Sequence, residues 1–215
     1  MLHSIFERDF VHNVYDTIAD AFNQSRFCYW NAVQTFLDGL SKNSIILDNG
    51  CGNGKYLAYR KDVTFIGNDM CLPLLDICKK KADVSYANGL NLPYRNNCFD
   101  AVICVAVLHH LSTSKRRQDF VNEMIRVLKI NGEAIITVWA REQNHKRFEK
   151  WIVHENGDAM IPWKNKKGDL ISQRYYHLFT ENELKDYFER ADSKIEIIKC
   201  FFEFENWCIH IKKLK

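Results

Sequence analysis

Three of the chain's nine glycines fall within five residues, directly after a short aliphatic run. The segment reads IILDNGCGNGK from Ile45 to Lys55. Glycine loses more conformational entropy on folding than any other residue, so this cluster indicates left-handed backbone or a very close approach to the main chain. The aliphatic run predicts a buried strand, and the glycines predict a tight loop after it.

The order of the remaining elements decides the fold class. Apolar runs predict strands, and apolar residues at helical spacing predict helices between them. We expect strands at 45–47, 63–67, 84–86, 99–107 and 134–139, with helices at 72–81 and from Ser112 or Thr113 to a stop at Asn131-Gly132. This alternation predicts an α/β protein with an open, parallel sheet and helices on both faces. The last two strands, at 195–204 and 207–211, are close enough to pair antiparallel.

A length of 215 residues suits a single domain. We expect N-terminal helices at about 11–22 and 30–40, within a segment 1–43. The part that carries the glycine loop is 44–141, an insertion follows at 142–179, and a C-terminal helix and strands occupy 180–215. Thr180 to Glu183 has the pattern of a capping box, which opens a helix.

Composition excludes some classes of protein. The net charge of +3 permits a nucleic-acid partner without demanding one. None of the eight cysteines forms a C-x-x-C pair, which argues against a zinc ribbon, and we expect no metal site. The apolar run 101–108 is far too short to span a membrane, and the N-terminus has no signal core. We therefore expect a cytoplasmic protein, with the nucleus as a second compartment.

The glycine loop is the first candidate ligand site, because ligands of such sheets bind beyond the carboxyl ends of the strands. A tight turn without a ligand is the alternative. A dinucleotide motif does not match, since its third glycine would come one residue later than Gly54. A phosphate-binding P-loop does not match either, since Tyr56 follows Lys55 in place of serine or threonine.

Two carboxylates indicate a different ligand. Asp69 ends the second expected strand, 15 residues after Gly54, where a carboxylate can accept hydrogen bonds from both hydroxyls of a ribose. Asp48 would repel a pyrophosphate but suits a cationic amino-acid ligand. S-adenosyl-L-methionine has an ammonium, a sulfonium and a ribose but no phosphate, so we expect it to lie over the glycines.

These residues resemble the cofactor signature of the class I S-adenosylmethionine-dependent methyltransferases. Further motifs, from about Phe10 to the last strand, resemble the eukaryotic tRNA wobble-uridine carboxymethyl methyltransferases. That family includes stand-alone fungal enzymes and the methyltransferase domain of a mammalian AlkB homologue. The motifs are HNVYDTIA at 12–19, GNGKY at 52–56, LPYR at 92–95, FDAV at 99–102, AVLHHLST at 106–113, VWA at 138–140, IPW at 161–163 and RYYHLF at 174–179.

The resemblance implies a seven-stranded, Rossmann-like sheet and a reaction. The family converts 5-carboxymethyluridine at the wobble position of tRNA to its methyl ester, as one subunit of a heterodimer with a small zinc-containing activator. The third strand is the expected docking edge for this partner. The implied cofactor-binding residues are Tyr15, Asp48, Gly50, Gly52, Gly54, Asp69, Met70, Asn88, Gly89, Leu90 and Val105.

Three positions depart from the family pattern. Asn88-Gly89 stands where an acid followed by alanine is usual, near the adenine. The amide of Asn88 can still accept a hydrogen bond from the adenine amino group, so we expect weaker cofactor binding. Asn49 replaces a small aliphatic residue, and Asn131-Gly132 replaces a pair of glycines.

The proposed acceptor needs no general base, because a carboxylic acid with a pKa near about 4 is already ionised at neutral pH. Catalysis is then expected to come mostly from placement and desolvation. We select Arg26 to bind a carboxylate, His109 and His110 at the end of the fourth strand, and Trp139 at the end of the fifth. Solvated charge, structural histidines and core packing remain the alternatives.

For the tRNA backbone we select basic residues, and for its bases two residues able to stack. These are Arg116, Arg117, Lys164, Lys166 and Lys167, with Tyr175 and His177 for stacking. A solvated charged face is the alternative for the basic set.

Two other functions remain open. One is a methyltransferase for a small carboxylate or a lipid, which shares the cofactor fold without a basic surface. The other is a non-catalytic cofactor-binding subunit, which calorimetry with S-adenosylmethionine would separate from the enzymes.

Overall fold

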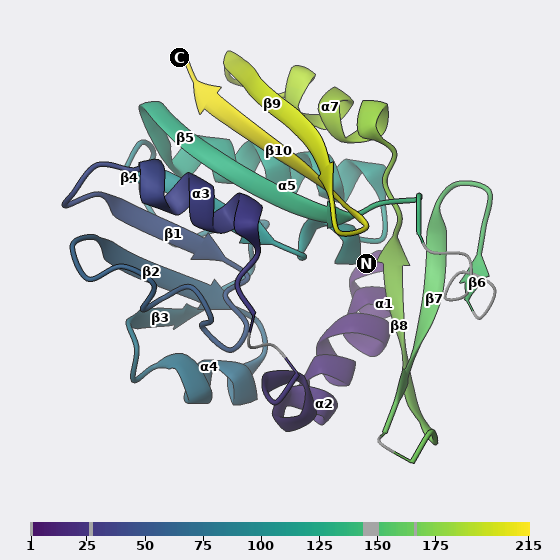
Figure 1. The fold of residues 1–215 in the computed structure, drawn as a ribbon. Helices are drawn as coiled ribbons and strands as arrows, with labels where there is room; N and C mark the ends of the chain where they lie inside the picture. Colours follow the sequence, from purple (N-terminus) through teal and green to yellow (C-terminus); the bar gives the residue numbers. More distant parts are fainter. Residues whose placement is uncertain (1, 26–27, 144–150, 166) are drawn as a thin grey trace.

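The centre of the computed structural model is a seven-stranded sheet in the order β3-β2-β1-β4-β5-β10-β9 (Figure 1). The residues described are 2–25, 28–143, 151–165 and 167–215. Neighbouring strands from β3 to β5 pair in parallel, and β10 pairs antiparallel with both β5 and β9. The strands are β1 (Ile45–Asn49), β2 (Thr64–Asp69), β3 (Asp83–Tyr86), β4 (Phe99–Val105), β5 (Leu128–Trp139), β9 (Ile195–Glu203) and β10 (Asn206–Lys213).

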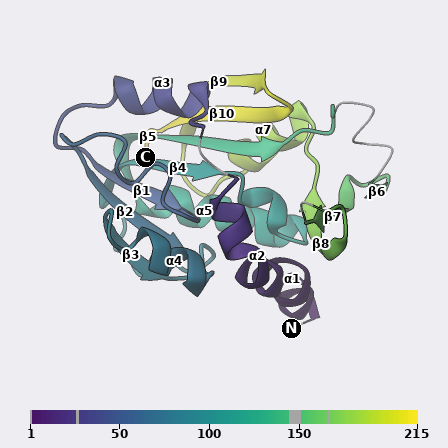
Figure 2. The same ribbon diagram turned by 60° about the horizontal axis from the view of Figure 1, so that its bottom comes forward.

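The apolar run of β4 packs against helices on both faces of the sheet. Val102 and Cys104 belong to the core formed with α5 (Ser114–Val127) and α7 (Glu181–Glu189). Ala101 and Ile103 belong to the core formed with α3 (Asn31–Gly39) and α4 (Leu72–Cys78). Figure 2 shows α3 and α5 on opposite sides of the sheet. Successive residues of a strand point to opposite faces, so a central strand is apolar over most of its length, as β4 is apart from Asp100, and the predicted fold class is confirmed.

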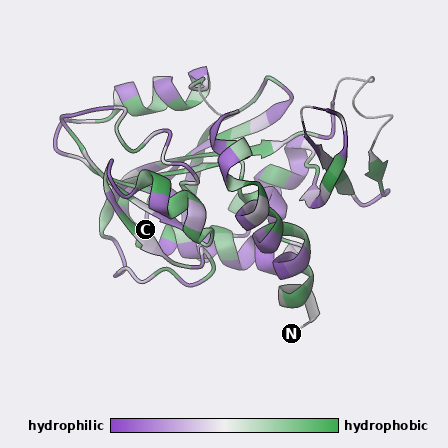
Figure 3. Ribbon diagram, turned by 90° about the horizontal axis from the view of Figure 1, so that it is seen from below, coloured by the Kyte–Doolittle hydropathy of each residue, from purple (hydrophilic) through white to green (hydrophobic). Residues whose placement is uncertain are grey.

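The helices carry hydrophobic and hydrophilic residues side by side, as expected for elements with one buried face (Figure 3). Predicted helix 72–81 ends earlier, at Cys78, and the ammonium of Lys81 instead donates hydrogen bonds to the carbonyls of Asn53 (2.9 Å) and Gly54 (3.3 Å). The lysine therefore holds the glycine loop. Within the described ranges, no helix is long and apolar enough to cross a membrane.

The N-terminal helical segment begins earlier than predicted. It comprises α1 (Leu2–Glu7), the π-helix η1 (Arg8–His12) and α2 (Asn13–Asn23), with no break between them. It packs against α4 and β8 (Leu170–His177), beyond the carboxyl ends of the parallel strands (Figure 1). The segment thus covers the edge of the sheet where a ligand is expected.

The insertion contains a small antiparallel sheet that the sequence analysis missed. Its strands are β6 (Ile152–Val153), β7 (Asp158–Lys164) and β8, in that order. Ala159, Ile161 and Tyr176 form a core with Trp139 at the end of β5. The small sheet therefore packs against the carboxyl end of the main sheet.

Asn131-Gly132 does not end a helix, so that prediction is wrong. Helix α5 ends at Val127 and β5 begins at Leu128. Asn131 has a left-handed φ of 65°, within a register shift between β4 and β5. A Cβ on Gly132 would lie 2.9 Å from the carbonyl oxygen of Asp100. Left-handed backbone is typical both of helix ends and of strand bulges. Asn131-Gly132 therefore belongs to the irregularity in the β4–β5 pairing and not to the end of a helix.

Candidate active site

The three clustered glycines have two different roles. All three have left-handed φ angles: 83° at Gly50, 52° at Gly52 and 67° at Gly54. A Cβ on Gly50 would lie 2.3 Å from a Val107 methyl, and one on Gly54 would lie 2.4 Å from the Cβ of Cys78. A Cβ on Gly52 would meet nothing nearer than the Phe22 ring at 3.7 Å. Gly50 and Gly54 therefore permit close packing, whereas Gly52 leaves space for a ligand.

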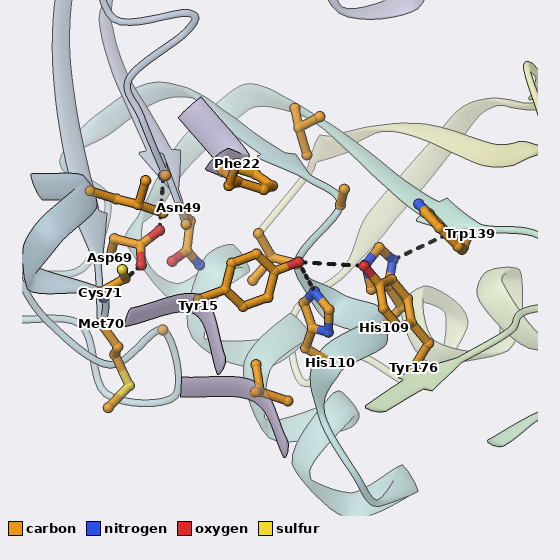
Figure 4. Close-up of a pocket in the computed structure, with 18 of the residues that line it drawn as sticks. Tyr15, Phe22, Asn49, Asp69, Met70, Cys71, His109, His110, Trp139 and Tyr176 are labelled. Carbon is orange, nitrogen blue, oxygen red and sulfur yellow. Dashed lines mark hydrogen bonds between the residues drawn. The ribbon is translucent and has the colours of Figure 1, made fainter. Parts of the chain in front are cut away.

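That space is part of a cavity of about 430 Å³ beyond the carboxyl ends of the parallel strands. Figure 4 shows its two ends, with the ring of Tyr15 between them. We call one the glycine end, lined by Asn49, Gly50, Gly52, Asn68 and Asp69, and the other the aromatic end, lined by His109, His110, Trp139 and Tyr176. The cavity also includes Met70, Asn88, Gly89 and Val105 of the predicted cofactor-binding set.

Asp69 is held firmly at the glycine end. Its Oδ2 accepts from the backbone N–H of Gly52 at 2.8 Å, and its Oδ1 accepts from that of Cys71 at 2.9 Å. Burial raises the pKa of Asp69, and these backbone donors oppose the rise. A carboxylate offers about four lone-pair positions, so Asp69 keeps acceptor capacity for hydroxyl groups of a ligand.

Two asparagines at the glycine end keep unused hydrogen-bonding atoms. The Nδ2 of Asn68 donates to the Oδ1 of Asn49 at 2.9 Å. The Nδ2 of Asn49 and the Oδ1 of Asn68 are buried with no partner in the described part of the chain. Buried polar groups are normally paired, so a donor and an acceptor here suit a polar ligand. The departure at Asn49 therefore adds a hydrogen-bond donor to this wall.

Three predicted cofactor-binding residues, Asp48, Gly54 and Leu90, lie outside the cavity lining. Asp48 is 2% exposed, and burial, followed by the charge of Asp69, raises its pKa to about 8. The neutral acid is therefore favoured at pH 7, which departs from the expected carboxylate facing an ammonium. At Asn88, the Oδ1 accepts from the backbone N–H of Leu90 at 2.9 Å.

Both histidines of the aromatic end are neutral. The Nδ1 of His109 accepts from the backbone N–H of Trp139 at 3.2 Å. Burial, and then the fields of His110 and Arg174, hold the pKa of His109 well below its usual value. The pKa of His110 is lowered to about 3, mainly by burial, although its bond to the Tyr175 carbonyl opposes the change. Neither imidazole can carry positive charge at pH 7.

The hydrogen bonds of His110 fix the direction of a short chain. Its Nδ1 lies 2.9 Å from the carbonyl oxygen of Tyr175, which can only accept, so Nδ1 carries the proton. Its Nε2 therefore accepts from the hydroxyl of Tyr15 at 3.0 Å. The Tyr15 hydroxyl also lies 3.4 Å from that of Tyr176 (Figure 4). Tyr15, placed with the cofactor by the sequence analysis, thus belongs to the wall between both ends.

Three of the predicted nucleic-acid-binding residues have structural roles instead, and the predicted catalytic residue Arg26 lies outside the described residues. Arg117 is buried, and its guanidinium donates to the Tyr187 hydroxyl and the Leu111 carbonyl, both at 2.9 Å. Tyr175 and His177 are also buried, at 3% exposure each, with their side chains bonded to Asp158. These three side chains hold the fold together and do not face a nucleic acid.

The other basic candidates differ in their surroundings. Arg116 forms a 2.6 Å salt bridge with Glu7, which is buried, so this pair ties α5 to α1. Lys164 and Lys167 are exposed at the end of the β7–β8 hairpin, and Lys166 lies outside the described residues. The hairpin lysines remain candidates for phosphate contacts.

Tyr176 and Asn68 are site residues that the sequence analysis missed. Tyr176 packs 4.7 Å from the ring of His109 and 4.5 Å from that of Trp139, measured between centroids. Adjacent residues of a strand face opposite ways, so only one of Tyr175 and Tyr176 could face the cavity. The sequence does not say which one, because the facing direction depends on the docking of the small sheet.

Comparisons with known proteins bear on the fold and the family of the chain. A family model described as a methyltransferase domain matches residues 47–136. A crystal structure of SAM-dependent methyltransferases from Methanosarcina mazei aligns over 86% of this chain and 98% of that one, with a TM-score of 0.68 and 22% identity. That likeness concerns the fold alone.

Relatives of known name carry the family assignment. The tRNA (carboxymethyluridine(34)-5-O)-methyltransferase alkbh8 of Xenopus tropicalis is 33% identical over 98% of this chain, which spans 42% of that longer protein. The tRNA (carboxymethyluridine(34)-5-O)-methyltransferase of Schizosaccharomyces pombe is 35% identical over 97% of this chain and 98% of its own length. This nearly end-to-end match shows that the chain belongs to the family of tRNA (carboxymethyluridine(34)-5-O)-methyltransferases.

Proposed function

We propose that this chain methylates the carboxylate of 5-carboxymethyluridine at position 34 of tRNA, the wobble position, as the catalytic subunit of a heterodimer. The observation that carries the proposal is the cavity with two chemically different ends, one open above Gly52 and the other walled by neutral imidazoles and aromatic rings. The relatives from Xenopus tropicalis and Schizosaccharomyces pombe support the choice of acceptor by their names.

The glycine end fits the cofactor, S-adenosyl-L-methionine. Asp69 has acceptor capacity for ribose hydroxyls, Gly52 leaves the main chain bare, and the unpaired atoms of Asn49 and Asn68 suit the edge of a nucleobase. When bound, the cofactor supplies a methyl group on a positively charged sulfur. Because the loop carries no phosphate-binding pattern, the same residues fit a nicotinamide dinucleotide poorly.

The aromatic end would position the acceptor without removing a proton from it. A carboxylate is ionised at neutral pH, so it needs no general base. His109 and His110 stay neutral there, so neither forms an ion pair that would stabilise the carboxylate before it reacts. Trp139 and Tyr176 exclude water with their rings. Holding two reactants in a good geometry is worth roughly 7–11 kcal/mol in favourable cases, which makes placement the main contribution.

The proposed partner is a small zinc-containing activator that docks on β3. This strand is at the edge of the main sheet, and Tyr86 on it is more than half exposed. Leu72, at the start of the adjacent helix α4, is also exposed. An edge strand with exposed apolar side chains suits pairing with a strand of another protein.

The test uses the chain purified with and without this activator, together with tRNA from cells that lack the chain. We expect methyl-ester formation at position 34, measured by mass spectrometry of the nucleosides, and accumulation of carboxymethyluridine in the deficient cells. The Asp69→Asn variant should lose cofactor binding in calorimetry, whereas Asp119→Asn, on the solvent side of α5 in a pair with Lys115, should not. Unchanged ester levels in the deficient cells would refute the proposal, and methylation of a small carboxylate or lipid instead would reassign the substrate. Cofactor binding without any transfer would indicate a non-catalytic subunit.

A further inference from the structure

Arg174 on β8 is a buried cation that has no carboxylate partner in the described ranges of the chain. The residue is 4% exposed, and among the residues that the structure describes no carboxylate forms a salt bridge with it. Its Nε is also buried, with no hydrogen-bond partner among those same residues. Its Nη1 lies 3.4 Å from the Tyr15 hydroxyl, a long contact. A buried charge is normally paired, so this arrangement requires an explanation.

Aromatic rings surround the guanidinium. Its central carbon lies 4.8 Å from the centroid of the Trp163 ring, 5.2 Å from that of Tyr176 and 6.0 Å from that of Tyr15. An arginine side chain stays protonated in proteins, so this buried group carries a full positive charge. Ring faces stabilise a cation without neutralising it, so its field persists in the surroundings.

That field reaches the aromatic end of the cavity. Arg174 contributes to the lowered pKa of both His109 and His110, after the larger effect of burial. Two of the rings around it, Tyr15 and Tyr176, also line the cavity. The charge therefore acts across one layer of phenol side chains on whatever occupies this end.

Hydrogen bonds of defined direction connect Arg174 with Tyr15 and His110. The Nη1 of Arg174 can only donate, so the Tyr15 oxygen accepts from it, and the Tyr15 hydroxyl donates in turn to His110. The Tyr176 hydroxyl, 3.4 Å from the Tyr15 oxygen, belongs to the same group. Because the proton of the Tyr15 hydroxyl is given to His110, Tyr176 supplies the hydroxyl of this group that can donate to an anion in the cavity, and nearby positive charge makes it a better donor.

We propose that Arg174 is the counter-charge for the acceptor carboxylate, acting as a positioning residue from behind the two phenol rings and through the hydroxyl of Tyr176. The proposal rests on the proposed function and adds the origin of the preference for an anionic acceptor over its neutral amide. A guanidinium in direct, bidentate contact would hold both carboxylate oxygens and make the acceptor a poorer nucleophile. A guanidinium behind the phenols favours the anion and leaves its oxygens available for methyl transfer.

The test compares two tRNAs that differ only at position 34, one with 5-carboxymethyluridine and one with neutral 5-carbamoylmethyluridine. We expect the wild-type protein, with any subunit it needs, to bind the carboxylate form about tenfold or more tightly, the range of one charged hydrogen bond. Arg174→Met should lose most of this preference and raise KM for the carboxylate tRNA. Cofactor affinity in calorimetry should stay unchanged. Arg174→Lys keeps the charge and should retain part of the preference.

The matched control is Arg190→Met, because Arg190 is an exposed arginine just after α7, paired with Asp186. It should bind both tRNAs like the wild type. If Arg174→Met proves too unstable to purify, Tyr176→Phe removes the donor hydroxyl, keeps the ring and should also reduce the preference. An equal loss for both tRNAs, or an undiminished preference in these variants, would overturn the role of Arg174. A wild-type protein that forms no ester would instead refute the proposed function.

Discussion

At the scale of single residues, the glycines of the loop have different roles, some in packing and one in binding. Gly54 faces the Cβ of Cys78, whereas Gly52 faces the cavity. Both have left-handed backbone, which costs an ordinary residue about 1–2 kcal/mol. The two positions should therefore respond differently to the same substitution.

Gly54→Ala should lower the free energy of unfolding by roughly 2–5 kcal/mol, because overpacking adds to the backbone strain. Gly52→Ala should lower it by only about 1–2 kcal/mol but weaken cofactor binding more strongly. Urea denaturation and calorimetry measure the two effects. Gly168→Ala is the matched control, since Gly168 also has a left-handed φ of 92° and no atom lies within 4 Å of its added Cβ. Equal cofactor affinity in Gly52→Ala and the control would contradict the assignment.

His177 gives the stability of the protein a pH dependence. Its Nδ1 lies 2.7 Å from an oxygen of Asp158, and its Nε2 lies 2.6 Å from one of Glu183. Burial opposes protonation, but these two carboxylate bonds outweigh it and raise the pKa of His177 above 6.5. Two carboxylate partners can both accept only from a doubly protonated imidazole.

The sign of this pH dependence follows from the linkage between protonation and folding. A pKa that is higher in the folded than in the unfolded state stabilises the protein fully below the unfolded value, and this stability is lost as the pH rises through the folded value. We expect the free energy of unfolding to fall as the pH rises above about 6.5, the unfolded pKa of histidine. The pH profile of His177→Gln should be flatter in this range. A wild-type profile that rises there would contradict the assignment.

At the scale of elements, the β9–β10 turn is strained at the rim of the cavity. Phe204 and Glu205 have left-handed φ angles of 47° and 63°. Phe204 is 80% exposed and lines the cavity mouth. The turn is held by Asn206, whose Nδ2 donates to the carbonyl of Phe204 at 2.6 Å. An exposed aromatic in a conformation that favours asparagine or glycine suits contact with a ligand.

Phe204→Asn should therefore raise the free energy of unfolding by about 1 kcal/mol, because asparagine tolerates this backbone. The same change should weaken tRNA binding about tenfold, the range of one base stacked on an aromatic ring. Thermal denaturation and a binding titration test both effects. Phe202→Asn is the control, since Phe202 is a half-exposed residue of the same hairpin with its ring 5.3 Å from that of Trp207. Unchanged tRNA affinity in Phe204→Asn would refute the contact.

The elements also show which parts of the fold can be predicted from the sequence. Long apolar runs such as β4 and the amphipathic spacing of α5 fixed the main sheet and its covering helices, because their periods leave little choice. The small sheet was missed because its strands do not alternate cleanly. Pro162 lies within β7, and β8 mixes polar Ser172 and Gln173 with buried aromatics. Its strands are apparent only once they pack against Trp139 and the N-terminal helices.

The same limit applies to the site. The glycines, Asp69 and the His109-His110 pair follow strands directly, so their place at the sheet edge could be predicted. The role of Arg174 could not, because Tyr15, its hydrogen-bond partner, is 159 residues distant in sequence. Burial, which makes Arg174 unusual and removes Arg117 from the surface, is a property of the folded chain alone.

At the scale of the whole molecule, the exposed charge of the β7–β8 hairpin should contribute to tRNA affinity. Lys164 and Lys167 lie at the connection between its two strands, and Figure 1 shows that this end of the hairpin points away from the main sheet. Each lysine that contacts a phosphate steepens the dependence of log affinity on log salt by about 1. The double variant Lys164→Ala, Lys167→Ala should therefore show a slope that is shallower by up to about 2. The control is Lys79→Ala at the C-terminal end of α4, where the lysine pairs with Asp76. An unchanged slope in the double variant would place the tRNA elsewhere.

The two ends of the cavity come from separate stretches of the chain. The ends of β1 and β2 and the glycine loop form the glycine end, while β8 of the insertion supplies Tyr176 to the aromatic end and Arg174 behind it. Some thirty-odd residues after β5 can thus change, in evolution or by design, and alter which acceptor receives the methyl group. The residues that bind the cofactor stay the same.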